Sequence, residues 1–242
     1  MYNLLISIAV GAAAALAILA FGFGWVATLG PGLIAFVAAY IVLARRTTKQ
    51  LERLFESMQK EIQAQRIDRA VATLQSAFPL ARWQFLVAAQ LHSAIGQLLY
   101  VKQDLEGALP HLEKSWVRQW VARGMLAAAH YRRKDVDGAV RILDEAVKAS
   151  KKEGLLWAVY AWVLEDAGRH EEAIRVLGRG VTANEKDEKL KATLQALQNG
   201  KKLKLGKTYQ QEWFQFLLER PPTQLVGGPG GMRVSKRALY GR

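Results

Sequence analysis

The residue types that could perform catalysis are few and widely separated in this chain of 242 residues. Its four histidines are His92, His111, His130 and His170. None has the H-x-x-x-H or H-E-x-x-H spacing that places two imidazoles on one helical face to bind zinc. Cysteine is absent, which excludes a disulfide framework, a thiolate nucleophile and a Cys-ligated metal. We therefore expect no metal site.

Other reactive motifs are also missing. The glycine-rich stretch at 227–231 lacks the Lys-Ser/Thr pair and the following helix of a P-loop, and no G-x-S-x-G occurs. Paired carboxylates such as Glu171 and Glu172 are interpreted as charges at helix ends. The sequence thus predicts a non-enzymatic protein, with no catalytic residues and no cofactor.

Charge divides the chain into two parts. Residues 2–44 contain no charged side chain, whereas the rest holds all 34 Lys and Arg and all 21 Asp and Glu, for a net charge of +13. A bilayer core of about 30 Å takes roughly 20 helical residues, and the uncharged run is twice that length. Glycines at 22–24 and 30–32 interrupt it. Residues 1–44 are therefore predicted to form a transmembrane helical hairpin, with spans near 3–22 and 27–44.

The orientation follows from the basic residues after the second span. Arg45, Arg46, Lys49 and Arg53 crowd this end, and the hairpin turn has nothing comparable. The positive-inside rule then places both termini and the soluble domain in the cytoplasm. We expect the membrane to be a bacterial inner membrane. A cleaved signal peptide is the disfavoured alternative, because the first segment lacks a basic n-region.

One short pattern recurs four times after residue 65. It consists of an acid, any residue, Ala, an aliphatic residue, two of any kind, Leu, and a small residue three later. Its alanines are Ala70, Ala108, Ala139 and Ala173, spaced by 38, 31 and 34 residues. Its leucines are Leu74, Leu112, Leu143 and Leu177. A small residue where two helices cross lets their backbones approach, and larger residues fill the groove.

This pattern resembles the tetratricopeptide repeat (TPR), a helix–turn–helix of 34 residues. The match is best at 154–187, where Trp157, Tyr160, Ala161 and Leu164 fall on the first helix and Gly168 in the turn. The resemblance implies an all-α protein with a TPR-like solenoid of about three to four helix pairs. We assign the repeat domain with its capping helix to 45–199.

In this family, first-helix residues line a concave groove that receives a protein partner. The resemblance places Ser93, Gln97, Tyr100, Gly124, Ala128, Tyr131, Ala158, Trp162 and Glu165 there. Three aromatic residues among them would suit an apolar helix or an extended peptide. The alternative is that some of them pack against the chain's own C-terminal segment.

The C-terminal segment, 200–242, combines an apolar stretch with basic clusters. Helical spacing of Tyr209, Trp213, Phe214, Phe216 and Leu217 predicts an amphipathic helix over 208–219. This helix would dock on the chain's own domain or on a partner. The basic residues are Lys201, Lys202, Lys204, Lys207, Arg233, Lys236, Arg237 and Arg242.

These features favour a membrane-anchored TPR-like adaptor that presents its groove to a protein partner in the assembly of a membrane complex. A competing hypothesis is that the basic tail binds anionic lipid headgroups, or less plausibly nucleic acid, while the repeats only support it. The two differ in salt dependence, because contacts to phosphate weaken as salt rises.

Overall fold

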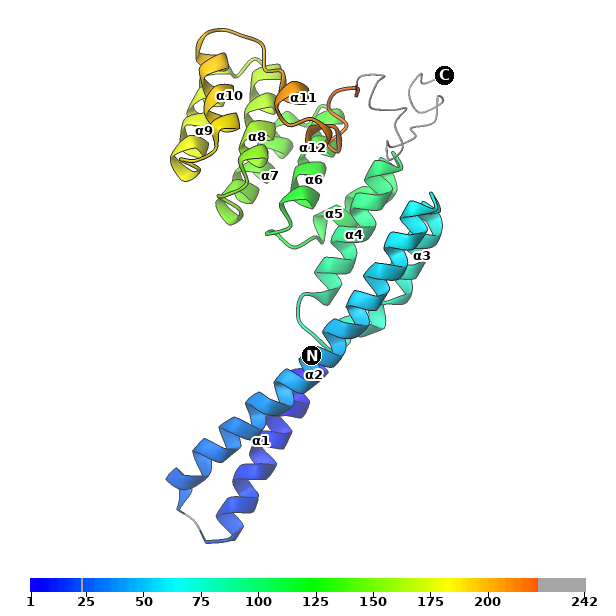
Figure 1. Cartoon of the computed structure of the whole chain (residues 1–242), viewed down its shortest axis with the longest axis vertical. Coiled ribbons are helices and arrows are strands. Elements are labelled where there is room, and N and C mark those ends of the chain that lie inside the picture. Colours follow the sequence, from blue (N-terminus) through cyan, green and yellow to red (C-terminus); the bar gives the residue numbers. More distant parts are fainter. Residues whose placement is uncertain (23, 222–242) are drawn as a thin grey trace. The chain divides into compact units, whose positions relative to one another are not determined.

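The computed structural model describes residues 1–22 and 24–221. It comprises two compact units, Met1–Ile95 and Gly96–Arg242, and each is described by itself (Figure 1). The described residues form helices and turns without any strand, which confirms the all-α class.

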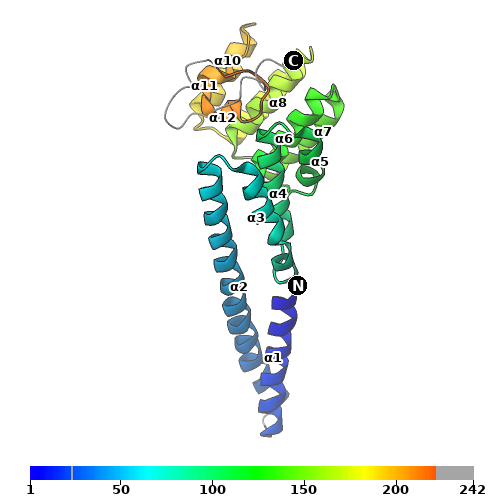
Figure 2. The same ribbon diagram turned by 90° about the vertical axis from the view of Figure 1, so that its right-hand side faces the viewer.

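The first unit begins with an antiparallel pair, α1 (Tyr2–Ala20) and α2 (Trp25–Gln63), which lie side by side (Figures 1 and 2). The buried residues of α1 are Asn3, Ser7 and Gly11, one on each turn. A Cβ added at Gly11 would lie 2.8 Å from the Phe36 Cβ. Small and polar residues therefore form the seam, as they do where helices associate in lipid.

Within residues 2–44, the outer surface of this pair is apolar. Ile8, Leu16 and Ile34 are 51%, 65% and 70% exposed. Both helices are long and apolar enough to cross a membrane, by length and composition. The second helix continues without a break past Arg45 into the charged part of the chain, where no Gly or Pro occurs between residues 33 and 78.

The first unit continues with α3 (Ile67–Ser76), which packs on α2, and a 3₁₀ helix η1 (Phe78–Arg82). Helix α4 (Val87–Val101) begins in the first unit and ends in the second. The helices that follow are α5 (Leu105–Glu113), α6 (Trp120–Arg132), α7 (Val136–Ala149), α8 (Gly154–Asp166), α9 (His170–Ala183) and α10 (Glu188–Gln198). They form antiparallel pairs α6/α7 and α8/α9, and α10 packs on α8 and α9.

The recurring pattern defines the helix crossings. All four of its alanines and all four of its leucines are fully buried. At the crossing of α8 and α9, a Cβ added at Gly180 would lie 2.8 Å from the Trp157 Cγ, so the indole packs directly on the α9 backbone. The prediction of TPR-like helix pairs is confirmed.

The turns that precede α3, α5, α7 and α9 share one backbone shape. Gln65, Gln103, Lys134 and Gly168 have φ values of 58°, 68°, 66° and 78°. Asp104 and Asp135 then cap the second helices, each accepting a hydrogen bond of 2.9 Å from the backbone N–H three residues later. Only the fourth turn uses glycine, the residue that adopts this left-handed conformation without steric cost.

The chain beyond α10 differs from the expected amphipathic helix over 208–219. It forms two four-residue helices, α11 (Leu205–Thr208) and α12 (Gln211–Phe214), with left-handed backbone at Gln210 and Leu217. The breaks allow five large side chains to be buried together, which a single helix would spread around its axis. They are Leu203, Leu205, Tyr209, Trp213 and Phe216.

Candidate functional site

The candidate site is the face formed by α6, α8 and the end of α4 within the second unit. We call residues 203–219 the terminal segment, and it lies on this face. Its Trp213 and Phe216 are fully buried. The chain's own C-terminal segment therefore packs on the predicted groove surface, which is the alternative that the sequence left open.

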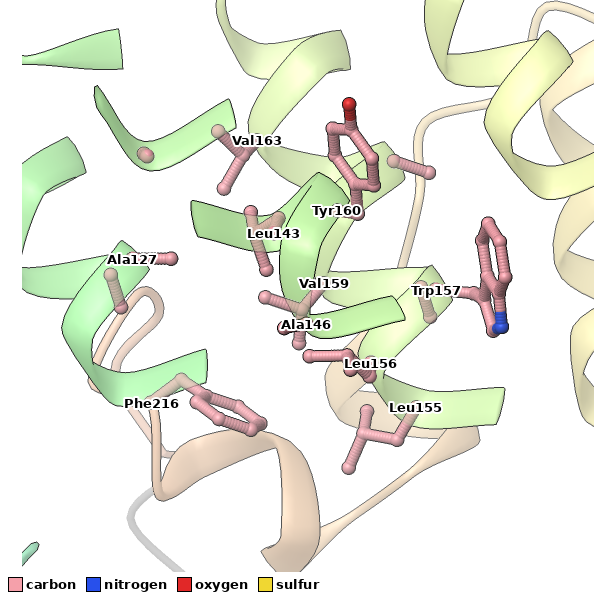
Figure 3. Packing of buried hydrophobic residues seen from close by; sticks show 14 of the residues in the cluster. Ala127, Leu143, Ala146, Leu155, Leu156, Trp157, Val159, Tyr160, Val163 and Phe216 are labelled. Atoms are coloured by element: carbon pink, nitrogen blue, oxygen red, sulfur yellow. The ribbon is translucent and has the colours of Figure 1, made fainter. Parts of the chain in front are cut away.

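Phe216 lies against a glycine of α6. A Cβ added at Gly124 would lie 2.6 Å from the Phe216 Cε1, so only glycine leaves room for the ring. The Trp120 ring lies beside it, with centroids 6.4 Å apart. Figure 3 shows Phe216 among the buried side chains of the repeats, near Ala127, Leu155 and Leu156. Gly124 thus lets the Phe216 ring lie directly on the backbone of α6.

A hydrogen bond fixes the backbone at the same point. The Tyr100 hydroxyl donates to the carbonyl oxygen of Phe216 at 2.6 Å. Tyr100 is fully buried, and desolvation raises its pKa to about 12, although Arg132 opposes the shift. The tyrosine therefore stays neutral and able to donate throughout the physiological range.

Trp213 completes a row of aromatic side chains across the face. Its ring centroid lies 5.4 Å from that of Trp162, which in turn lies 5.7 Å from that of Tyr131, both edge to face. Such pairs add about 0.5–1.5 kcal/mol beyond the area that they bury. Glu219 joins the row, because its carboxylate accepts hydrogen bonds from the indoles of Trp162 and Trp213 at 3.3 and 2.8 Å.

Ion pairs and hydrogen bonds surround the ends of α6 and α8. The Tyr131 hydroxyl donates to Asp166, and the His170 ring pairs with Glu165 at 2.7 Å. His130 makes the equivalent contact with Asp135 at 2.7 Å. That hydrogen bond lowers the pKa of Asp135, with help from the Gly138 N–H. The two histidine contacts tie a first helix to the start of the second helix in its pair, whereas the Tyr131–Asp166 hydrogen bond joins α6 to α8.

Three of the other predicted groove residues, Ser93, Ala128 and Ala158, are buried, whereas Gln97, Tyr131 and Glu165 are half-buried. Ala128 and Ala158 are fully buried. Ser93 is buried and donates to the Ala89 carbonyl of its own helix at 2.7 Å, while Gln97 is half-buried. Tyr100, Gly124 and Trp162 are thus the predicted groove residues that directly meet the terminal segment.

The residues predicted for the interaction helix and the basic tail differ in how exposed they are. Tyr209, Trp213 and Phe216 face inward, and Phe214 and Leu217 are half-buried. Lys201, Lys202, Lys204 and Lys207 are exposed. The other basic residues singled out from the sequence, Arg233, Lys236, Arg237 and Arg242, lie outside the described residues.

Two contributors to the site were missed in the sequence. Trp120 falls outside the family's groove positions, and Glu219 was included only as the end of the amphipathic stretch. The inward-facing Leu203 and Leu205 did leave a signal, because they alternate with lysines. That period of two suits an extended chain with one face covered.

The site carries no evident reaction chemistry. Within the described residues, no group of three or more His, Asp or Glu side chains could hold a metal ion. The raised pKa values of Tyr100 and Tyr131 arise mainly from burial. The arrangement is suited to holding a peptide segment through aromatic packing and a backbone hydrogen bond.

Paired helices that cross at small residues define a helical-repeat protein. The sequence profile of the tetratricopeptide repeat family matches residues 130–197, so the repeats are TPR-like. Structurally, a MamA double mutant (MamA RS-1 ArsTM) is similar, with 13% identity and a TM-score of 0.46 over 69% of this chain and 92% of that one. MamA protein is similar with 12% identity and a TM-score of 0.47, over 76% and 94%. No curated protein matches the sequence.

Proposed function

We propose that this protein is a non-enzymatic, membrane-anchored TPR-like scaffold whose concave face binds a peptide segment of a protein partner. The terminal segment occupies that face until a partner replaces it. Such a protein would help to assemble a complex at the membrane to which its helical hairpin anchors it. We place the repeats on the cytoplasmic side, because the basic residues follow the second span.

The observation that carries this proposal is the way in which the face holds the terminal segment. Tyr100 binds a backbone carbonyl, Gly124 makes room for an aromatic ring, and Trp162 pairs with both an indole and a carboxylate. These contacts would recognise a short peptide with two aromatic residues followed by an acid. TPR-like repeats provide the fold on which such recognition is built.

The apolar hairpin supports the membrane anchor. Its exposed side chains are large and apolar, while its seam holds small and polar residues. Since α2 continues unbroken to Gln63, a rigid helix would connect the membrane to the first helix pair. A partner bound to the repeats would then be held close to the membrane.

A labelled synthetic peptide of residues 203–219 tests the proposal directly. Full-length protein in nanodiscs should bind it weakly, because the same segment occupies the face in cis. The double variant Trp213→Ala/Phe216→Ala should bind it at least tenfold more tightly, since its own segment no longer competes. Fluorescence anisotropy would measure both affinities.

Two variants keep the result interpretable. Adding Trp162→Ala to the double variant should abolish peptide binding, whereas adding the exposed Glu212→Ala should not. Circular dichroism would verify that each variant remains folded. If the folded double variant bound no peptide, the concave face would not be a receptor for such segments.

A second candidate function is favoured by the exposure of four lysines around the terminal segment. Lys201, Lys202, Lys204 and Lys207 point outward while the leucines between them are buried. In this alternative the basic residues bind anionic lipid, each gaining up to about 1 kcal/mol near a charged surface. Binding to anionic vesicles that weakens steeply with salt and is lost in a four-lysine-to-glutamine variant would favour it.

A further inference from the structure

We propose that the turn formed by residues 78–86 is a third membrane contact, which inserts Trp83 and Phe85 into the lipid interface beside the hairpin. We call this stretch the aromatic turn. The inference rests on the proposed membrane anchor. It adds a surface that the hairpin alone would not provide, and all of its evidence lies inside the first unit.

The aromatic turn presents apolar side chains to its surroundings. Trp83 is 40% and Phe85 is 64% exposed, although most large apolar side chains of the repeats are buried. Its conformation is well defined, because the Trp83 N–H donates to the Leu80 carbonyl at 3.0 Å and Leu86 has a left-handed backbone, with φ of 69°. A non-glycine residue keeps such a conformation only where its surroundings hold it.

Contacts with the start of α1 fix the position of the aromatic turn along the axis of the hairpin. The Asn3 backbone N–H donates to the Trp83 carbonyl at 3.1 Å. The Tyr2 ring meets the Trp83 ring edge to face, with centroids 5.4 Å apart. The aromatic turn therefore lies at the end of α1 where the chain enters the apolar hairpin.

The same end of the hairpin carries its basic residues. The Asn3 Nδ2 donates to the Thr47 Oγ1 at 3.0 Å, which places residue 47 of α2 level with residue 3 of α1. At 1.5 Å of rise per residue, Arg45, Arg46 and Lys49 lie within about 3 Å of that level along the helix axis. All three are exposed, as is Arg82 in the turn itself.

Aromatic and basic residues at one level are the combination that a lipid headgroup layer accommodates. Trp and Tyr rings concentrate at this depth, because they present an apolar body and a polar edge. Cations there meet lipid phosphates. No acidic residue precedes Glu52, and none occurs in 78–86, so nothing in these stretches would repel anionic headgroups. Tyr2, Trp83 and Phe85 thus fit the interface of the membrane that the hairpin crosses.

Spin labelling of full-length protein in nanodiscs of phosphatidylcholine and phosphatidylglycerol tests this proposal. Because the chain has no native cysteine, a single nitroxide can be placed at Phe85→Cys. Ile8→Cys in the hairpin and Lys151→Cys in an exposed turn of the repeats serve as references. The measured quantity is the accessibility of each nitroxide to oxygen relative to a water-soluble nickel complex.

The Phe85 label should give a ratio between the Ile8 and Lys151 values, and adding Trp83→Ser should shift it toward the Lys151 value. A Phe85 ratio equal to that of Lys151, while the Ile8 label remains in lipid, would overturn the aromatic-turn proposal alone. An Ile8 label fully accessible to nickel would overturn the membrane anchor, and with it this inference.

Discussion

The helical hairpin and the repeats bury opposite kinds of residue. In the hairpin, Asn3, Ser7 and Gly11 form the seam, while Leu16 and Ile34 remain exposed. In the repeats, leucines, alanines and Trp157 are buried, and the terminal segment covers the apolar face that the first helices would otherwise expose. Both regions are helical, but the hairpin buries small and polar residues and exposes large apolar ones, whereas the repeats bury their large apolar residues.

This difference indicates which surroundings each region requires. The apolar surface of the repeats is buried by the same chain, because Trp213 and Phe216 of the terminal segment pack into the core. The hairpin instead packs through close backbone contact, which in water would leave its aliphatic residues exposed at a cost of about 25 cal/mol per Å². Lipid removes that cost. The comparison therefore supports a hairpin in a membrane and repeats in water.

The largest expected loss of stability comes from a substitution in the terminal segment, which covers the apolar face of the repeats. Trp213→Ala should lower the free energy of unfolding by roughly 3–5 kcal/mol, because it empties a fully buried site. The exposed apolar face should then bind a hydrophobic dye, so the repeats would resemble the hairpin. Urea denaturation and dye fluorescence would measure both effects. The neighbouring exposed Glu212→Ala should change stability by less than about 0.5 kcal/mol. An equally small effect of Trp213→Ala would contradict the self-covered face.

A charge in the hairpin gives the next largest effect. Ile8→Lys should cost roughly 3 kcal/mol of insertion free energy if this exposed position faces lipid. Val117→Lys, at a comparably exposed position in the repeats, should leave insertion unchanged. Cell-free synthesis with membrane vesicles would measure the inserted fraction of each variant. Equal insertion of both would contradict the assignment of different surroundings.

Gly124→Ala tests the contact between α6 and the Phe216 ring. The added methyl would clash with the Phe216 ring, and overpacking of this kind costs about 1–3 kcal/mol. The double variant Gly124→Ala/Phe216→Ala should show a smaller loss than the sum of the single variants. Strict additivity in a double-mutant cycle would mean that the two residues do not meet.

The hydrogen bond from Tyr100 predicts a dependence on alkaline pH. Its folded-state pKa is about 12 against an ordinary value of 10.0, so its contribution is fully present below pH 10 and is lost as pH rises toward 12. Tyr100→Phe should lower stability by about 1 kcal/mol at neutral pH, because the Phe216 carbonyl loses its donor. It should also reduce the decline above pH 10, which denaturation at several pH values would measure. An unchanged decline would assign the pH dependence to other tyrosines.

The smallest effect is a gain. Lys134→Gly should stabilise the repeats by about 0.5–1 kcal/mol, because Lys134 has the left-handed backbone that glycine adopts freely. Arg133→Gly should instead destabilise them, since Arg133 has a φ of −84°. Thermal denaturation would measure the stability of both variants, and the two adjacent substitutions should change it in opposite directions.

The sequence by itself determined the features that depend on local pattern. The uncharged run predicted two apolar helices, and the buried alanines and leucines followed from a repeating spacing alone. Both predictions are correct because amphipathicity and helix crossing depend on residues close together in the chain. The continuation of α2 past Arg45 likewise agrees with the absence of Gly and Pro between residues 33 and 78.

Only the tertiary structure decided how the terminal segment is used. The spacing of Tyr209, Trp213 and Phe216 predicted one helix, yet the chain breaks at Gln210 and Leu217 to bring its large side chains to α6 and α8. The contacts that favour this shape, Phe216 with Gly124 and with Tyr100, join residues about a hundred positions apart. Local propensity carries no information about such partners, because burial against a distant surface outweighs it.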